Sequence, residues 1–267
     1  MKRTSIIFIL VLTSMTNIFA QTEADFNVTL TDDNTGVVIT KYTGKATNVI
    51  IPATIQGMPV KEIGKQAFSS SEITNIVIPE GVVKIQNGSF FVGIPFEGAF
   101  IGCFNLISVT LPSTLTEIGS CAFVHCMSLN SITIPQNVTE IGDIAFSNSG
   151  LTSINLPVKL KIIREGTFSN CKNISSVILS EGITEIQKNA FSRCTSLTSV
   201  ALPSTIATIG VDAFNGCTAL TTLIIPESVV QIKFDTTYEN INNSFKGTGL
   251  TLANQAALRR RGYTGDF

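Results

Sequence analysis

The chain has 267 residues, a formal net charge of −1 and a charged fraction of 14%, against about 25% in an average globular protein. Its length is enough for one large domain or two small ones. The near-neutral charge excludes the strongly basic surface that nucleic-acid-binding proteins present to phosphates, so we expect no nucleic-acid partner.

Residues 1–20 have the layout of a secretory signal peptide. Two basic residues precede an apolar run over residues 6–12, and Ile18 and Ala20 occupy the −3 and −1 positions of a cleavage site. A transmembrane anchor is the alternative, but the run is too short to span about 30 Å of hydrocarbon. We therefore expect an exported protein, secreted, on the cell surface or periplasmic, whose mature chain starts at Gln21 and contains no transmembrane segment.

Residues 21–46 are expected to form an N-terminal β-hairpin cap. Residues 26–31 and 37–42 alternate like strands, and the sequence between them, DDNTG, is a turn signal. The hairpin would cover the first of the repeats that follow, because a stack of repeats needs a capped end.

Residues 47–249 carry a repeat with a period close to 23. From Pro112 onward the prolines, and Ser180 in the same register, are spaced by 23, 22, 23, 23 and 23 residues. The aligned unit reads L-x-x-I-x-I-P-x-x-V-x-x-I-x-x-x-A-F-x-x-C, and about eight units fit between Val49 and Phe245. A period of this length that opens on L-x-x-L-x-L is the signature of a leucine-rich repeat.

The unit that starts at Leu129 shows why this pattern folds as a coil. Ile132 and Ile134 point to one side of a short strand, and Thr133 points to the other. Pro135 ends the strand because it has no N–H to donate. One coil cannot bury its apolar residues, whereas stacked coils bury them in a continuous core. The sequence predicts a right-handed solenoid, mainly β, with one strand per coil and short turns or 3-10 segments.

Two columns of residues follow from the register. One position holds a phenylalanine in most units and predicts an aromatic column in the core: Phe68, Phe123, Phe146, Phe168, Phe191, Phe214 and Phe245. Three residues later stand Cys103, Cys126, Cys171, Cys194 and Cys217, whereas Cys121 is out of register. Coils about 4.8 Å apart would permit disulfides between neighbours, with Cys194 and Cys217 the first pair to test. Buried free thiols and metal ligands are the other interpretations. Serine at positions 71 and 149 favours small buried side chains.

One unit contains a ten-residue insertion near residues 90–99. The distance from Pro79 to Pro112 is 33, and both Phe90 and Phe100 are placed to join the aromatic column. If Phe100 joins it, four apolar residues fall in a loop: Phe90, Phe91, Ile94 and Phe96. An exposed apolar cluster predicts a contact site, here for self-association rather than for a host ligand. The alternative is a loop that buries its own side chains.

Strand residues that face away from the core form two ladders. The first is Asn75, Ser108, Ser131, Ser153, Ser176, Ser199 and Thr222; the second is Val77, Thr110, Thr133, Asn155, Ile178, Ala201 and Ile224. The second becomes apolar toward its C-terminal end. This strip is either a docking surface for a protein or a set of good β-formers on a sheet face.

Residues 250–267 are expected to form a C-terminal helical cap. Thr251 is a good N-cap, and Gly262 suits the position after the helix. Three arginines at 259–261 fall in the last turn, where cations complement the helix dipole. A patch for an anionic surface is the alternative interpretation of these arginines.

Catalytic motifs are missing from the sequence. It contains neither a Gly-rich phosphate loop nor a nucleophile elbow. His125 is its one histidine, whereas metal sites need several converging ligands. Four glutamates recur with the spacing of the repeat and are interpreted as a solvated face: Glu117, Glu140, Glu165 and Glu185. We expect no enzymatic activity, no metal and no cofactor.

The motif IPxxVxxIGxxAFxxC, the first unit at residues 51–68 and the entry segment at residues 27–45 resemble the BspA-like leucine-rich-repeat family of host-associated bacteria. The tail at residues 251–267 resembles that of spirochaete members. The resemblance implies a bacterial protein-binding scaffold at the cell surface, an adhesin for host or extracellular-matrix proteins such as fibronectin or fibrinogen. The alternative is a self-associating periplasmic or envelope component that forms homo-oligomers and has no host ligand.

Overall fold

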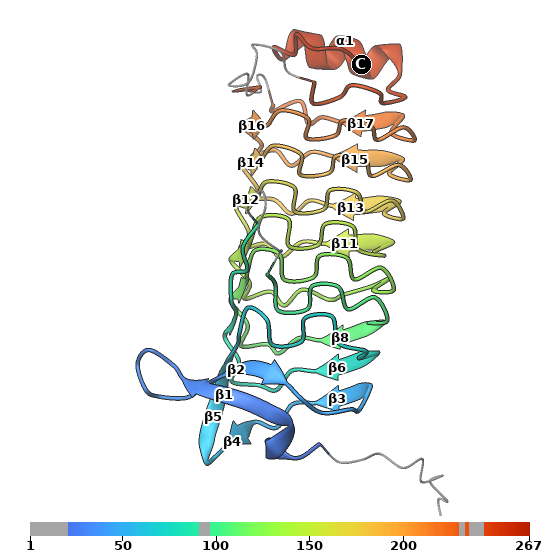
Figure 1. Ribbon diagram of the computed structural model, residues 1–267. Coiled ribbons are helices and arrows are strands. Elements are labelled where there is room, and N and C mark those ends of the chain that lie inside the picture. Colours follow the sequence, from blue (N-terminus) through green and yellow to red (C-terminus); the bar gives the residue numbers. More distant parts are fainter. Residues whose placement is uncertain (1–20, 91–96, 230–232, 235–242) are drawn as a thin grey trace, which may run out of the picture.

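The computed structural model describes residues 21–90, 97–229, 233–234 and 243–267. It is a β-solenoid of about eight coils stacked in a column, with a hairpin at one end and a helix at the other (Figure 1). Within these residues, no helix has the length and apolar character needed to cross a membrane.

The N-terminal cap is the predicted hairpin, extended by the first coil. After a 3-10 helix, η1 (Glu23–Asp25), strand β1 (Phe26–Leu30) pairs antiparallel with β2 (Val37–Tyr42). Strand β2 then runs parallel to β5 (Met58–Ile63), which also forms a small antiparallel pair with β4 (Thr54–Ile55). The hairpin thus starts the sheet that the repeats continue (Figure 1).

Each regular coil contributes two strands, which stack into parallel ladders on two sides of the column. The first side, here the long-strand face, consists of β3 (Asn48–Ile50), β6 (Asn75–Val77), β8 (Ser108–Thr110), β11 (Ser153–Asn155), β13 (Ser176–Ile178), β15 (Ser199–Ala201) and β17 (Thr222–Ile224). The second side, the short-strand face, continues β5 with β7 (Lys84–Ile85), β9 (Glu117–Ile118), β10 (Glu140–Ile141), β12 (Ile162–Ile163), β14 (Glu185–Ile186), β16 (Thr208–Ile209) and β18 (Lys233–Phe234).

The predicted aromatic column fills the core. Neighbouring rings stack nearly parallel, with centroids from 4.9 Å (Phe100–Phe123) to 5.6 Å (Phe146–Phe168) apart. This spacing is close to the strand separation of about 4.8 Å, so each coil adds one ring. Tyr42 extends the stack at the N-terminal end, and Tyr263 closes it edge-on at the other.

The choice between the two phenylalanines of the insertion is settled in favour of Phe100. Its ring is buried in the stack, 5.1 Å from that of Phe68. Ser89 and Glu97 form an antiparallel bridge at the base of the inserted loop. Phe90 lies in this loop with 37% of its surface exposed. Phe91, Ile94 and Phe96 lie outside the described residues.

The cysteines are free and buried. Each of the five in register donates a hydrogen bond from Sγ to the carbonyl of a core phenylalanine in the preceding coil; Cys103 to Phe68 is 3.0 Å and Cys194 to Phe168 is 3.2 Å. Burial raises the pKa of Cys171 to about 11. The thiol column therefore joins neighbouring coils by hydrogen bonds. In the described part of the chain no group of residues is arranged to hold a metal ion.

Side-chain amides close both outer edges of the long-strand face. At the C-terminal end, Thr251 caps the helix α1 (Leu252–Arg260), as predicted, and Asn254 exchanges two hydrogen bonds with the backbone of Leu223 in β17. At the N-terminal end, the amide of Gln21 bonds the Asn48 carbonyl and the Ile50 N–H of β3. Both edges are thus protected from pairing with another chain.

Candidate protein-binding face

The long-strand face presents three outward positions per coil, and none of them holds a charged residue. Its first column is Thr47, Thr74, Ile107, Asn130, Thr152, Ser175, Thr198 and Thr221; its second is Asn48, Asn75, Ser108, Ser131, Ser153, Ser176, Ser199 and Thr222. Its third, named the C column, is Ile50, Val77, Thr110, Thr133, Asn155, Ile178, Ala201 and Ile224. An exposed face without charges is notable, because Asp, Glu, Lys and Arg are mostly found at the surface.

Six predicted site residues share the C column: Thr110, Thr133, Asn155, Ile178, Ala201 and Ile224. The last four are in register on adjacent strands from β11 to β17. Ile178 is 63% exposed and Ile224 is 57% exposed. The sequence reasoning missed Ile50, which is 60% exposed beside Val77 at the other end. The C column is therefore apolar at both ends and polar in its middle.

The long-strand face is interrupted in its middle. The strand expected around Ile132 does not form, and residues 131–133 have no strand partner on either side. No backbone hydrogen bond links residues 107–111 to residues 130–134, all of which the structure describes. A cavity of about 600 Å³ opens at this place, and both Thr110 and Thr133 line it.

The length of one coil accounts for the interruption. Residues 129–150 form the one coil with 22 residues, the exception in the proline spacing. The shorter turn after Phe146 brings Gly150 so close to the preceding coil that a Cβ atom there would lie 2.1 Å from the Met127 carbonyl oxygen. The short-strand ladder also breaks beside this coil, between β10 and β12. A shorter coil cannot keep register with both longer neighbours along its whole perimeter.

One carboxylate stands at the rim of the cavity. Glu80 accepts hydrogen bonds from the N–H (2.9 Å) and the Oγ (3.0 Å) of Ser113 in the next coil. These bonds hold the pKa of Glu80 below its usual value, so it is charged at neutral pH. Asn137 donates to the Ser113 carbonyl at 3.0 Å and completes the polar side of the opening.

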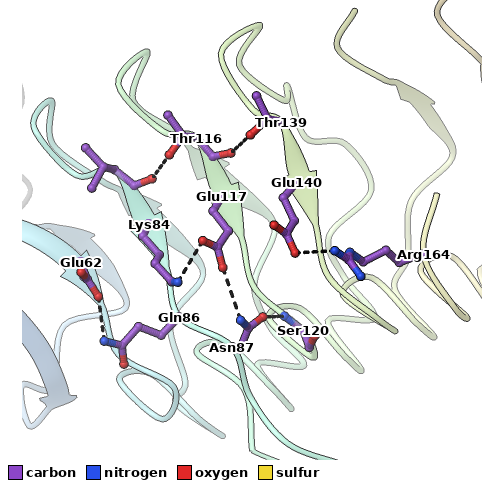
Figure 2. A network of polar contacts seen from close by, with 11 residues as sticks. Glu62, Lys84, Gln86, Asn87, Thr116, Glu117, Ser120, Thr139, Glu140 and Arg164 are labelled. Atoms are coloured by element: carbon purple, nitrogen blue, oxygen red, sulfur yellow. Dashed lines mark hydrogen bonds and ion pairs between the residues drawn. The ribbon is translucent and has the colours of Figure 1, made fainter. Parts of the chain in front are cut away.

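The short-strand face, by contrast, is charged. Figure 2 shows Lys84 paired with Glu117 and Arg164 paired with Glu140, each at 2.9 Å. Glu117 and Glu140 are neighbours in the β9–β10 register, so like charges stand side by side. A cation from each flanking coil offsets this repulsion. Of the four glutamates predicted as a solvated face, Glu117, Glu140 and Glu165 are ion-paired, whereas Glu185 accepts a hydrogen bond from Gln187. Charge thus separates the two faces.

The inserted loop lies apart from the C column. It leaves the coil after β7, and Glu97 fixes its base through Lys65 Nζ at 2.9 Å and Ser89 Oγ at 2.8 Å. Phe90 therefore belongs to the side of the coil that follows the short strand. The structure brings the C-column residues together and leaves Phe90 outside that group.

The arrangement defines a leucine-rich-repeat β-solenoid with one uncharged face. The sequence matches the family model described as BspA type Leucine rich repeat region in six copies, over residues 27–93, 96–221 and 184–249. The chain belongs to this family, whose members are generally protein-binding scaffolds without enzymatic activity. It matches no curated protein at a significant level.

Three solved structures are similar. The T. pallidum leucine-rich-repeat protein TpLRR has a TM-score of 0.65 and 28% identity, over 92% of this chain and 98% of that one. A leucine-rich-repeat protein from Bacteroides ovatus has a TM-score of 0.53 and 19% identity, over 85% and 80%. One from Eubacterium ventriosum has a TM-score of 0.53 and 25% identity, over 76% and 65%. These likenesses support the fold described above.

Proposed function

We propose that this protein is an exported, surface-exposed scaffold whose long-strand face binds proteins, and that it acts as an adhesin for host or extracellular-matrix proteins such as fibronectin or fibrinogen. The observation that carries the proposal is the uncharged face itself, with exposed isoleucines at positions 50, 178 and 224. The centres of protein interfaces are depleted in charged residues. An exposed apolar strip on a scaffold of this family marks a docking surface.

Export is part of this proposal and rests on residues 1–20, which lie outside the described residues. Their composition supports cleavage after Ala20. Gln21 would then be the first residue of the mature chain, and it is also the residue that closes the edge of β3. N-terminal sequencing of the protein recovered from its native cells tests this; a chain that still starts at Met1 would contradict it.

Binding to immobilised fibronectin, fibrinogen and laminin tests the adhesin function. The variant Ile178→Glu/Ile224→Glu places two charges on the C column and should weaken binding by at least about ten-fold. Val158→Glu is the matched control, because Val158 is 61% exposed but lies outside the long-strand face. A flat response to all three proteins, or equal binding by both variants, would refute this form of the proposal.

Self-association is the second candidate, and the symmetry of the C column favours it. If two copies met face to face in antiparallel orientation, Ile50 of one would oppose Ile224 of the other, and Val77 would oppose Ala201. Thr133 would then oppose Asn155 near the two-fold axis, and Thr110 would oppose Ile178. Sedimentation equilibrium distinguishes the candidates: a strict monomer that binds a matrix protein excludes the homo-oligomer.

A further inference from the structure

The interruption of the long-strand face leaves an unpaired strand edge inside the solenoid. In β8, the N–H of Ser108 bonds Thr74 and the carbonyl of Thr110 accepts from Ile78, so these groups face β6. Successive residues of a strand direct their N–H and C=O groups to opposite edges. The N–H and C=O of Val109, and the N–H of Leu111, therefore face residues 130–134.

At most regular junctions the N–H that corresponds to that of Leu111 is bonded; the exception is Leu179, between β13 and β15. The N–H of Leu202 bonds the Ile224 carbonyl at 2.9 Å, and that of Leu156 bonds the Ile178 carbonyl at 3.3 Å. Their counterpart would be a bond from Leu111 to Thr133, which does not form. Backbone groups near the core need partners, and amide side chains supply them at both outer edges of this face. Among the described residues, no side chain bonds the inner edge at β8.

The opening beside this edge has the chemistry to receive a peptide. This β8 cleft, between β8 and residues 130–134, has a volume of about 600 Å³ and is lined by Val109, Thr110, Leu111 and Thr133, with Glu80 at its rim. The volume is within the roughly 300–1,000 Å³ of ligand pockets. An extended peptide offers the alternating N–H and C=O groups that an unpaired strand lacks. A carboxylate at the rim attracts a basic side chain.

We propose that the β8 cleft binds an extended segment of the partner protein, which adds to β8 as a strand through Val109 and Leu111 and places a lysine or arginine at Glu80. The inference rests on the proposed protein-binding function and identifies the element of the partner that is recognised. The inference assigns two roles to one face: the C column supplies apolar contact, and the cleft binds an extended segment that carries a basic side chain.

Amide hydrogen exchange in the unliganded protein is the first test. The amides of Val109 and Leu111 should exchange at least about ten-fold faster than those of Val200 and Leu202, their counterparts in a paired strand. Equal protection of the two pairs would mean that the edge is closed, and would overturn the proposal.

Selection from a phage-displayed library of random peptides is the second test. Enriched peptides should contain lysine or arginine. Thr133→Trp fills the cleft from an exposed position and should weaken the binding of these peptides by about ten-fold or more. Thr184→Trp is the control, since Thr184 is also an exposed threonine but lies just before β14, outside the long-strand face. Peptides that bind both variants equally, or the absence of any enriched peptide, would overturn the proposal.

The charge is tested by a matched pair of glutamates. Glu181 stands in the register of Glu80 and bonds Ser204 as Glu80 bonds Ser113, but the strands that precede Glu181 and Ser204, β13 and β15, are paired. Glu80→Gln should weaken the selected peptides by about three- to ten-fold, whereas Glu181→Gln should leave them unchanged. Equal effects of both changes would mean that no basic side chain of the peptide pairs with Glu80, and would overturn that part of the proposal.

The two proposals fail separately. If Thr133→Trp leaves binding of a matrix protein intact and Ile178→Glu/Ile224→Glu abolishes it, the partner uses the C column alone; the cleft proposal fails and the proposed function stands. If selected peptides respond to the cleft variants while no matrix protein binds, the cleft proposal stands and the adhesin function fails.

Discussion

At the scale of single residues, the cysteine column shows how one small side chain serves both packing and hydrogen bonding. Each thiol fills the interior next to a phenylalanine ring and donates to a carbonyl one coil away. Two coils place serine there, and Ser149 in turn contacts Cys171 Sγ at 3.3 Å. The position therefore requires a small donor rather than sulfur chemistry.

Cys194→Ala and Cys194→Ser test this requirement. Alanine removes the donor and leaves the Phe168 carbonyl with one partner fewer, so we expect a loss of about 1–2 kcal/mol in the free energy of unfolding. Serine keeps a donor of similar size and should cost less than alanine. Urea unfolding of both variants measures the difference; a larger loss for serine than for alanine would contradict the role assigned to the thiol.

The burial of the cysteine thiols also predicts a loss of stability at alkaline pH. The pKa of Cys171 is raised to about 11, from 9.0 for an exposed thiol. Above pH 9 the unfolded chain releases this proton while the native chain retains it. Stability is therefore complete below pH 9 and falls as the pH rises toward 11, by at most about 1.4 kcal/mol per pH unit for each such thiol. Urea midpoints at pH 8 and pH 10 measure the fall, and Cys171→Ser should reduce it.

At the scale of elements, the helix α1 protects a strand edge as well as covering the core. Asn254 mimics a strand by bonding both the N–H and the carbonyl of Leu223. Asn254→Ala should cost about 1–3 kcal/mol and promote association through the freed edge of β17. Arg260→Ala, at an exposed position on the same helix, is the control. Thermal unfolding and light scattering measure both effects, and equal behaviour of the two variants would contradict the capping role.

The sequence predicted the two caps and the long strand of the regular coils, but not the short strand that each regular coil adds. The hairpin, the aromatic column and the helix with Thr251 as N-cap are confirmed, because each depends on local pattern or on the repeat register. The insertion left two phenylalanines in register, and only packing decides that Phe100 joins the stack.

The interruption at residues 131–133 could not be predicted from residue types, because LNSITIP satisfies the strand pattern as well as any other unit. Its one signal is the spacing of 22 between Pro135 and Pro157. A missing residue indicates strain in the stack, but it does not say on which side of the coil the ladder opens. The cleft and its unpaired edge are thus properties of the junction between coils, which no single repeat contains.

At the scale of the whole molecule, the coil at residues 129–150 divides the solenoid. Both ladders break beside it, whereas the aromatic stack and the turn hydrogen bonds continue through it; Phe146 N–H donates to the Thr167 carbonyl at 2.9 Å. In a linear stack, stability is close to a sum of terms between neighbouring coils. The junction after residues 129–150 lacks ladder bonds, so it depends more on the contact between Phe146 and Phe168. We expect the stack to separate there into two cooperative units.

Phe146→Leu and Phe191→Leu test this division. Both remove a fully buried ring from the same column and should each cost about 1–3 kcal/mol. Only Phe146→Leu weakens a junction at which both ladders are broken. Its urea unfolding should therefore broaden, with a lower m-value, or resolve into two transitions. Phe191→Leu lies between intact ladders and should unfold in one transition. If both variants keep a single transition with the m-value of the unmodified protein, the broken ladders do not divide the molecule, and cooperativity is carried by the aromatic stack alone.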